Sequence, residues 1–162
     1  MQSFVIEGGN PAKGLVTPGG NKNEALPCLA ACLLTDQEVI LENVPAIRDV
    51  QSMVELMSSV GAEVAWIEPN TIRVQARSID RYELDRALCS RLRASILVAG
   101  PMAARKGRVS LPPPGGDVIG RRRVDTHLIG FANLGAKVEV EQSYLVEAPA
   151  TGLVGADIFL DE

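Results

Sequence analysis

The sequence has few residues of the kinds that build metal or redox sites. Its 162 residues include a single histidine, His127, and three cysteines, Cys28, Cys32 and Cys89. A lone histidine with an odd number of cysteines provides no plausible set of zinc ligands. We therefore predict that the chain holds no metal and needs no cofactor. The three cysteines are expected to pack as small buried hydrophobic residues, and His127 to make a structural hydrogen bond.

The sequence also lacks the signals of secreted and membrane-spanning proteins. The start "MQSFVIEGGNPAKG" has neither a basic stretch nor an apolar run, and no later apolar run is long enough to span a bilayer. Together with the cysteine usage, this predicts a reducing, cytoplasmic location. The net charge of -4 makes general binding to nucleic acid or to a membrane surface a poor expectation. Any anion site must come from local clusters of basic residues.

Hydrophobic residues make up 46% of the chain. This content is enough for one ordinary domain with a core, and it excludes a disordered tail. The spacing of apolar residues predicts helices over residues 21–34, 49–60, 82–105 and 124–134. Pro101 is expected to kink the third of them. Runs rich in β-branched residues predict strands over residues 3–7, 38–44, 62–66, 71–76, 107–112, 136–141, 144–148 and 152–162.

The same order of elements occurs twice along the chain. The stretch "VGAEVAW" at Val60 is similar to "LGAKVEV" at Leu134, and "RVQA" at Arg73 is similar to "LVEA" at Leu145. In both places a helix ends at a glycine and two strands follow. The residue-by-residue match is weak, and chance similarity of two amphipathic helices is the alternative. We interpret the order as a duplicated βαβαββ-type unit, which predicts an α/β (α+β) fold.

The start of the first predicted helix has features of an anion site. Gly19 and Gly20 lead directly into Asn21, Lys22 and Asn23. Free backbone N–H groups, the positive end of the helix dipole and a lysine ammonium would then lie together. The spacing is not that of a phosphate-binding P-loop. The alternative is that Asn23 is an N-cap and Lys22 a solvated charge.

The segment "LPPPGGDVIGRRRVDTH", residues 111–127, combines a lone carboxylate with a cluster of arginines. Its glycines do not have the spacing of a dinucleotide fingerprint. Asp117 can serve as a general acid or base, or it can be an ordinary turn aspartate. Arg122 and Arg123 can bind a phosphate group bidentately, or they can form a solvated face.

Two further arginines lie in the predicted helix 82–105. Arg91 and Arg93 are two positions apart, so on a continuous helix they point to different faces. We therefore expect at most one of them to face a site, and nothing local indicates which.

Six stretches of the chain resemble one family in the right order. They are "FVIEGG", "GGNKNEALPCLAACLL", "LENVPAIRDV", "RLRASILVAGPMAARKG", "LPPPGGDVIGRRRVDTH" and "GLVGADIFLDE". The family is that of the UDP-N-acetylglucosamine 1-carboxyvinyltransferases, the enolpyruvyl transferases of peptidoglycan synthesis. The resemblance implies transfer of the enolpyruvyl group of phosphoenolpyruvate to the 3-hydroxyl of UDP-N-acetylglucosamine. It also implies roles in cell wall biogenesis, cell shape and cell division, with those two molecules as partners and neither nucleic acid nor a membrane.

The resemblance also implies roles for individual residues. Lys22 and Asn23 match the pair that contacts phosphoenolpyruvate, and Arg93 matches the substrate-binding arginine of the "RAS" motif. The segment that cradles the nucleotide sugar and reaches toward phosphate corresponds to Arg122, Arg123, Val124, Asp125 and Thr126. Lys22 and Arg122 are thereby catalytic candidates together with Asp117.

Asp117 stands where most family members carry a cysteine that donates a proton to the methylene carbon of phosphoenolpyruvate. A carboxyl group in its place is expected to keep that role. It is also expected to give resistance to the epoxide fosfomycin, which alkylates the cysteine. The chain departs from the usual family pattern at Asn21, Arg123 and Thr126, where alanine, proline and leucine are usual.

The resemblance covers only the first part of the family's length. Family enzymes have two inside-out α/β domains with the active site between them. We expect residues 1–20 to form a strand and linker that belong to the other domain. Residues 21–162 then form an incomplete inside-out domain of about two βαβαββ units. Such a chain is expected to be inactive alone and to self-associate through the surface that the missing half would cover.

Two other functions stay open on this evidence. The first is a non-catalytic fragment or binding module that retains affinity for UDP-N-acetylglucosamine. The second is the shikimate-pathway enolpyruvyl transferase, which has the same fold. Its N-terminal signature is similar to G-S-K-S, whereas this chain has "GGNKNEALP", so we rank it below the others.

Overall fold

The computed structural model describes residues 3–9, 11–116 and 123–160. In the first half of the chain the elements are α1 (Lys22–Ala31), the 3-10 helix η1 (Cys32–Leu34), β1 (Glu38–Leu41), α2 (Arg48–Ser59), β2 (Glu63–Glu68) and β3 (Thr71–Gln75). In the second half they are α3 (Arg86–Arg91), the 3-10 helix η2 (Arg93–Val98), α4 (Ala99–Lys106), β4 (Arg108–Leu111), α5 (Asp125–Asn133), β5 (Lys137–Val140) and β6 (Tyr144–Glu147). No helix in these described ranges has the length and apolar character needed to cross a membrane.

The strands of the described residues form two antiparallel three-stranded sheets with the same topology. Their orders are β1-β3-β2 and β4-β6-β5, so the last strand of each unit lies in the centre. The helix before each strand pair is followed by a glycine in the left-handed region, Gly61 with φ 112° and Gly135 with φ 90°. Only glycine adopts this conformation without strain. The shared topology supports the duplicated unit that the sequence predicts.

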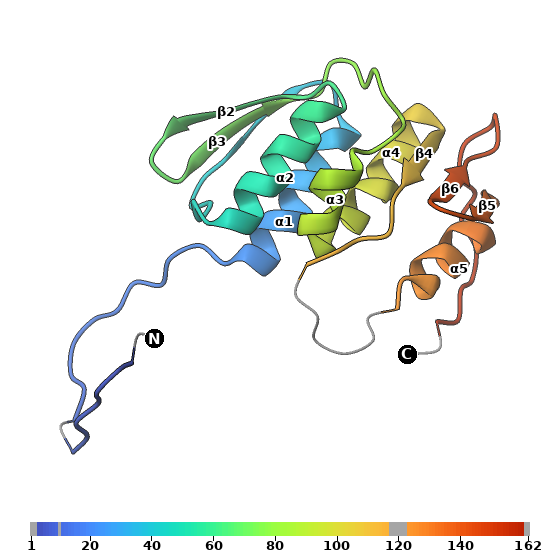
Figure 1. Ribbon diagram of the computed structural model, residues 1–162. Coiled ribbons are helices and arrows are strands. Elements are labelled where there is room, and N and C mark those ends of the chain that lie inside the picture. The colour runs from blue at the N-terminus through green and yellow to red at the C-terminus, as the bar shows by residue number, and fades with distance from the viewer. Residues whose placement is uncertain (1–2, 10, 117–122, 161–162) are drawn as a thin grey trace.

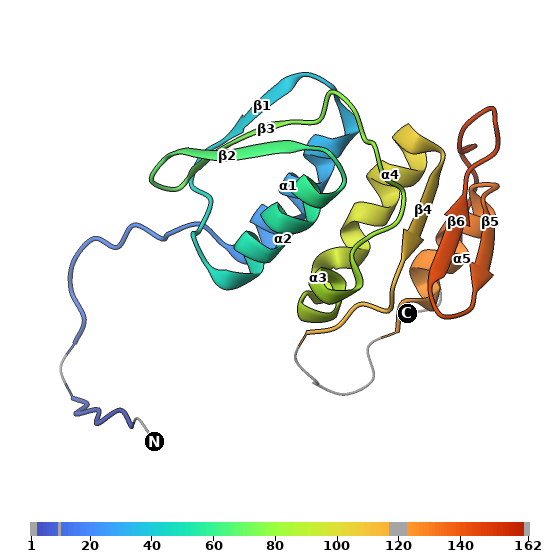
Figure 2. The same cartoon turned by 45° about the horizontal axis from the view of Figure 1, so that its top comes forward.

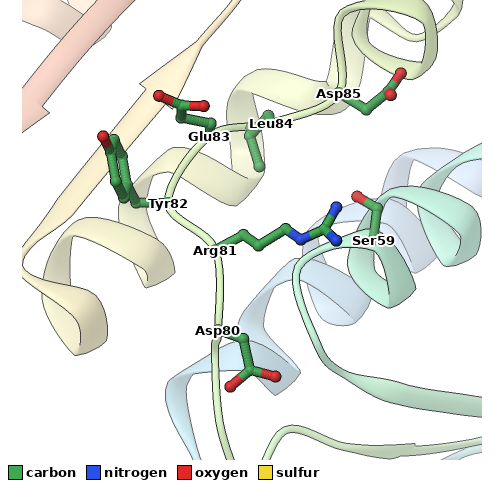
Figure 3. A pocket seen from close by; sticks show the side chains of 7 residues that line it. All are labelled: Ser59, Asp80, Arg81, Tyr82, Glu83, Leu84 and Asp85. Atoms are coloured by element: carbon green, nitrogen blue, oxygen red, sulfur yellow. The ribbon is translucent and has the colours of Figure 1, made fainter.

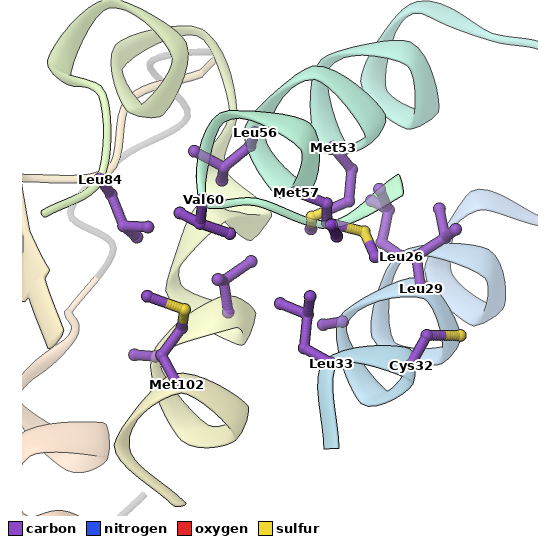
Figure 4. Packing of buried hydrophobic residues seen from close by; sticks show 14 of the residues in the cluster. Leu26, Leu29, Cys32, Leu33, Met53, Leu56, Met57, Val60, Leu84 and Met102 are labelled. Carbon is purple, nitrogen blue, oxygen red and sulfur yellow. The ribbon is translucent and has the colours of Figure 1, made fainter. Parts of the chain in front are cut away.

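Helices α1 to α4 lie inside and the two sheets outside, which is the expected inside-out arrangement (Figures 1 and 2). Figures 1 and 2 show α1, α2, α3 and α4 between the two sheets. The core between these helices is drawn in Figure 4, where Leu29 of α1 and Leu33 of η1 face Met53 and Met57 of α2, and Met102 of α4 lies on another side of the same core. All five side chains have no exposed surface. Burying each contributes about 1.5–3 kcal/mol to folding.

The two units differ at their edges. Residues 82–84 pair in parallel with β4, because Leu84 N donates to Ser110 O at 2.9 Å and Ser110 N donates to Tyr82 O at 2.8 Å. This segment gives the second unit the start of its first strand. In contrast, α5 contributes no fully buried residue within the described chain, and its Ile129 is 47% exposed. Helix α5 therefore leaves part of its apolar surface uncovered.

The prediction of one continuous helix over residues 82–105 is wrong. The chain forms α3, η2 and α4 in succession, and Leu92 between the first two has extended angles, φ -131° and ψ 111°. Leu92 is 3% exposed, so this break places its side chain in the core. Pro101 is not at the break. It lies in the first turn of α4, where its missing N–H costs little.

The prediction of a strand at each end of the sequence is also wrong, as far as the structure describes those ends. Residues 3–9 and 152–160 have no strand assignment. Phe4 and Val5 are 95% and 90% exposed. A run of β-branched residues forms a strand only where another strand supplies hydrogen-bond partners and an apolar face to cover. The composition of these segments was therefore not sufficient to predict their structure.

Arg105 of α4 ties the second unit to the first. Its Nη1 donates to the backbone oxygens of Leu33, Thr35 and Ala76 at 3.0, 2.9 and 2.6 Å. These carbonyls lie at the end of η1 and just after β3, so they belong to the first unit. One guanidinium group thus satisfies three acceptors where the units meet.

The cysteines fit their predicted packing role in two of three cases. Cys32 and Cys89 are buried, but Cys28 is exposed. The spacing of Cys28 and Cys32 predicts a shared helix face. However, α1 ends at Ala31 and tightens into η1, where Cys32 Sγ donates to Cys28 O at 3.2 Å. The two thiols nevertheless have different environments, since only Cys32 is buried.

Burial gives the chain a predicted loss of stability at alkaline pH. It raises the pKa of Cys32 and of Cys89 from 9.0 to about 11. Because the unfolded thiols ionise first, unfolding releases protons above pH 9, and stability falls as the pH rises to about 11. We expect about 1–2 kcal/mol from each buried thiol. Urea unfolding across this range should show a smaller fall in Cys89→Ala than in the wild-type chain. Identical pH profiles for the two chains would contradict the prediction.

Candidate active site

A cavity of about 750 Å³ lies where α1, α2 and η2 begin. The charged and amide side chains that line it come from the first turns of those helices and from the end of α3. They are Lys22, Asn23, Arg48, Asp49, Arg91 and Arg93. Helix N-termini carry partial positive charge from their free N–H groups. The cavity therefore combines four cationic side chains with one carboxylate in a chain whose net charge is -4.

Asn21, not Asn23, is the N-cap of α1. Asn21 Oδ1 accepts a hydrogen bond from Asn23 N at 2.7 Å, and Asn21 O accepts from Ala25 N at 2.9 Å. The alternative in which Asn23 caps the helix is therefore wrong. Because Asn21 takes the capping role, Lys22 and Asn23 occupy the first turn with their side chains at the cavity. Position 20, just before the helix, requires glycine, because a Cβ there would lie 1.8 Å from the backbone oxygen of Asn43.

Lys22 makes an ion pair that the sequence did not reveal. Its Nζ lies 2.7 Å from Asp49 Oδ2, in the first turn of α2. Sequence reasoning also missed Arg48, which lines the same cavity. A signal was present: Arg48 and Asp49 stand at the start of an amphipathic helix, where side chains of the first turn project beyond the helix end.

Arg91 and Arg93 both line the cavity, contrary to the expectation that at most one would. The break at Leu92 separates them, so helical spacing no longer sends them to opposite faces. Arg93 donates from Nη2 to the backbone oxygen of Arg123 at 2.7 Å. Within the described chain, Arg48 and Arg91 have neither an ion pair nor a hydrogen bond from their guanidinium groups.

The chain enters the segment that carries Asp117 at the edge of this cavity. Gly115 N donates to Cys89 O at 2.9 Å, and Gly116 N donates to Ser90 O at 3.1 Å. Gly116, with φ 91°, is itself part of the cavity lining. The predicted site residues Asp117 and Arg122 lie outside the described residues.

The other predicted residues of this segment lie at the start of α5. Arg123 donates from Nε to both carboxylate oxygens of Asp125, at 3.0 and 2.8 Å. This hydrogen bonding lowers the pKa of the Asp125 carboxyl. Val124 is buried, and Thr126 is half-buried beside it. None of the four lines the cavity, and the contact from Arg93 to Arg123 O connects them to it.

His127 is exposed, and its backbone N–H donates to Val124 O at 3.1 Å. The structural hydrogen bond predicted for its side chain is not found among the described residues. Those residues also contain no group of three or more histidine, cysteine or acidic side chains placed to bind a metal ion.

A second hollow, of about 530 Å³, has the opposite charge. Figure 3 shows it between the end of α2 and the segment before α3, with Arg81 reaching toward Ser59. Its lining includes three carboxylates, those of Asp80, Glu83 and Asp85. Because these groups repel anions, the hollow is unsuited to phosphate-bearing substrates. The cationic cavity is therefore the candidate site.

The chain is similar to proteins of known name along its whole length. Residues 6–161 match the family described as EPSP synthase (3-phosphoshikimate 1-carboxyvinyltransferase). UDP-N-acetylglucosamine 1-carboxyvinyltransferase from Bradyrhizobium diazoefficiens is 55% identical over 159 residues, which are 98% of this chain and 36% of that protein. The proteins of the same name from Borreliella burgdorferi and Treponema denticola are 46% and 45% identical over the full chain and 38% of their own lengths. The chain thus spans little more than a third of these relatives.

Solved structures are similar to the chain in fold. The enolpyruvyl transferase NikO from Streptomyces tendae superposes with a TM-score of 0.70 at 24% identity, over 91% of this chain and 32% of NikO. EPSP synthase from Acinetobacter baumannii superposes with a TM-score of 0.57 at 12% identity, over 83% of this chain and 32% of its own. At these identities the similarity establishes the α/β fold with its open sheets and not the substrate.

Proposed function

The chain belongs to the EPSP synthase (3-phosphoshikimate 1-carboxyvinyltransferase) family, and from this membership we propose that it forms part of an enolpyruvyl transferase site. The proposed reaction joins the enolpyruvyl group of phosphoenolpyruvate to the 3-hydroxyl of UDP-N-acetylglucosamine and releases phosphate. The observation that carries the proposal is the cavity, which gathers Lys22, Asn23 and Arg93 with further cationic side chains. Both substrates are anionic, so a positive cavity in an acidic chain suits them. The names of relatives at 41–55% identity support the choice of nucleotide sugar.

In the proposed mechanism, phosphoenolpyruvate binds with its phosphate at the start of α1. Lys22 and Asn23 hold it there, and Arg122 neutralises charge on the phosphate. Asp117 donates its proton to the methylene carbon, so the neighbouring carbon becomes electron-poor. The sugar hydroxyl then bonds to that carbon and loses its proton. Loss of phosphate, with removal of a proton from the new methyl group, restores the double bond.

The nucleotide sugar is proposed to bind across the second unit. Arg93 contacts it from the cavity, and the segment at the start of α5 cradles it through Arg123, Val124, Asp125 and Thr126. The hydrogen bond from Arg93 to Arg123 O supports this grouping because it joins the cavity to that segment. In its ion pair with Asp125, Arg123 uses the guanidinium N–H donors that would otherwise bind a phosphate group bidentately. We therefore assign Arg123 to positioning the segment.

We propose that the two repeated units of this chain make up only part of the active site and that a second domain completes it. We propose that residues 1–20 belong to a second domain and that residues 21–162 form part of the first. The exposed apolar side chains of Ile129 and Val140, 47% and 61% accessible, support an uncovered interface that can also mediate self-association. A non-catalytic module that binds UDP-N-acetylglucosamine is the second candidate, because the chain covers only 36–38% of its relatives.

We further propose a cytoplasmic protein of peptidoglycan synthesis, with the consequences for cell wall biogenesis, cell shape and cell division that this step has. The three unpaired cysteines support the reducing compartment. The shikimate-pathway reaction is the lowest-ranked alternative. It shares the family description, but the relatives at 41–55% identity carry the other name.

Fosfomycin is predicted not to modify this chain. The epoxide alkylates a thiolate much more readily than a carboxylate, because sulfur is the stronger nucleophile. Asp117 replaces the cysteine at the reactive position, so mass spectrometry after incubation with the drug should show no adduct at that residue. A stoichiometric mass increase located to Asp117 would contradict the prediction.

Phosphate release from phosphoenolpyruvate, with and without UDP-N-acetylglucosamine, tests the proposed function. The 162-residue chain alone is expected to release none. A chimera in which the chain replaces the matching 159 residues of the Bradyrhizobium relative should release phosphate only when the nucleotide sugar is present. A folded chimera that binds the sugar without releasing phosphate would favour the binding module. Release by the chain alone would show that its copies complete the site together.

A further inference from the structure

The carboxylate of Asp49 lies in a place that is unusual for an anion-binding cavity. It stands among Lys22, Arg48, Arg91 and Arg93, which are the cationic side chains of the lining. Its Oδ2 lies 2.7 Å from Lys22 Nζ, so the two side chains form an ion pair. The cation closest to the proposed phosphate site therefore already has an anionic partner.

The ion pair between Lys22 and Asp49 is expected to contribute little to the stability of the fold. The Lys22 and Asp49 side chains remain 49% and 37% exposed, and pairs this exposed contribute little to folding because water and salt screen them. The contact between α1 and α2 is supplied by buried apolar residues such as Leu29 and Met53. A neutral side chain of the same shape at position 49 would leave that packing intact.

We propose that Asp49 is an internal competitor for anionic substrate at Lys22. This inference rests on the proposed function and concerns the same site. In the ligand-free chain the carboxylate occupies one of the three N–H donors of the Lys22 ammonium and lowers the positive potential of the cavity. An incoming phosphate group must share the ammonium with Asp49 or displace it. Asp49 thus weakens the binding of single anions.

The competitor has a fixed position because of its place on α2. Asp49 is in the first turn, where the N–H groups of the helix stabilise a negative charge. The N-cap residue, Ile47, has no side chain that can accept these hydrogen bonds. The helix end therefore favours a carboxylate at this point, and α1 brings Lys22 to it.

Calorimetric titration of the 162-residue chain with inorganic phosphate at low ionic strength tests the proposal. Asp49→Asn keeps the shape of the side chain and removes its charge, and it should bind phosphate about three- to tenfold more tightly. Glu55→Gln makes the same charge change on the exposed side of α2, away from the cavity lining, and should change the affinity by less than about twofold.

A double-mutant cycle separates competition at Lys22 from a general effect of charge. In a Lys22→Gln background, Asp49→Asn should improve phosphate binding less than it does in the wild-type chain, because the contested ammonium is gone. Equal improvement in both backgrounds would overturn the proposal. Unchanged or weaker binding by a folded Asp49→Asn chain would overturn it as well.

The two proposals fail in different ways. If the wild-type chain and Asp49→Asn bind phosphate with equal affinity, the internal competitor is wrong and the proposed site stands. If neither folded chain binds phosphate or phosphoenolpyruvate, the proposed function loses its main support and the competitor is wrong with it. Phosphoenolpyruvate should follow the same order of affinities as phosphate.

Discussion

Replacing Asp117 by asparagine is expected to lower enolpyruvyl transfer by about 10²–10⁴-fold, the usual contribution of a positioned general acid. Asparagine has a similar shape and cannot give a proton to carbon. The backbone hydrogen bonds of Gly115 and Gly116 bring the chain to the cavity edge immediately before this residue. Substrate binding should therefore persist while turnover is lost.

The measurement uses the chimera with the Bradyrhizobium relative, because it supplies the rest of the family's length. Asp36→Asn, an exposed aspartate outside the cavity lining, controls for loss of one charge. Asp117→Cys restores a proton donor of the usual family type. It should recover most of the turnover and become sensitive to alkylation by fosfomycin. Full turnover in the asparagine variant would show that another group donates the proton.

Replacing Gly115 by alanine is expected to have the largest effect on the structure around the site. A Cβ at this position would lie 1.7 Å from Ser90 O and 2.4 Å from its carbonyl carbon. Both neighbours are backbone atoms and cannot rotate away, so either the loop or α3 must shift. We expect a loss on the order of 3 kcal/mol in the free energy of unfolding. The hydrogen bonds from Gly115 and Gly116 to Cys89 and Ser90 should weaken.

Urea unfolding gives the stability change, and amide hydrogen exchange at residues 115 and 116 gives the local effect. Gly155→Ala is the matched control, because a Cβ at Gly155 would meet no atom within 4 Å. Phosphate binding should also weaken in Gly115→Ala, since Arg91 and Arg93 flank the part of the chain that has to move. Wild-type stability and protected amides in this variant would contradict the prediction, because the loop would then accommodate the added Cβ without losing these hydrogen bonds.

The sequence predicted most of the local structure because local structure depends on near neighbours. Apolar spacing located α2 and α5 to within one or two residues. The recurrence of helix, glycine and strand pair predicted the repeated topology, since Gly61 and Gly135 each permit the left-handed turn. Lys22 and Asn23 were predicted at a helix start, and they line the cavity there.

Prediction failed where the result depended on residues distant in the sequence. The strands expected at residues 3–7 and 152–162 needed partners that composition does not supply. The helix expected over residues 82–105 breaks at Leu92, whose burial in the core outweighs the helical preference of its neighbours. That break alone brings Arg91 and Arg93 to one cavity.

The sequence by itself determined which residues the chain can offer for chemistry: a lysine and an asparagine at a helix start, a lone aspartate, and arginines on either side of it. Only the tertiary structure decided which of them meet. The ion pair of Lys22 with Asp49 joins residues 27 positions apart, and it exists because α1 and α2 pack through their apolar faces. Side-chain chemistry is a local property of the sequence, whereas the distance between two charges depends on the packing of the core that carries them.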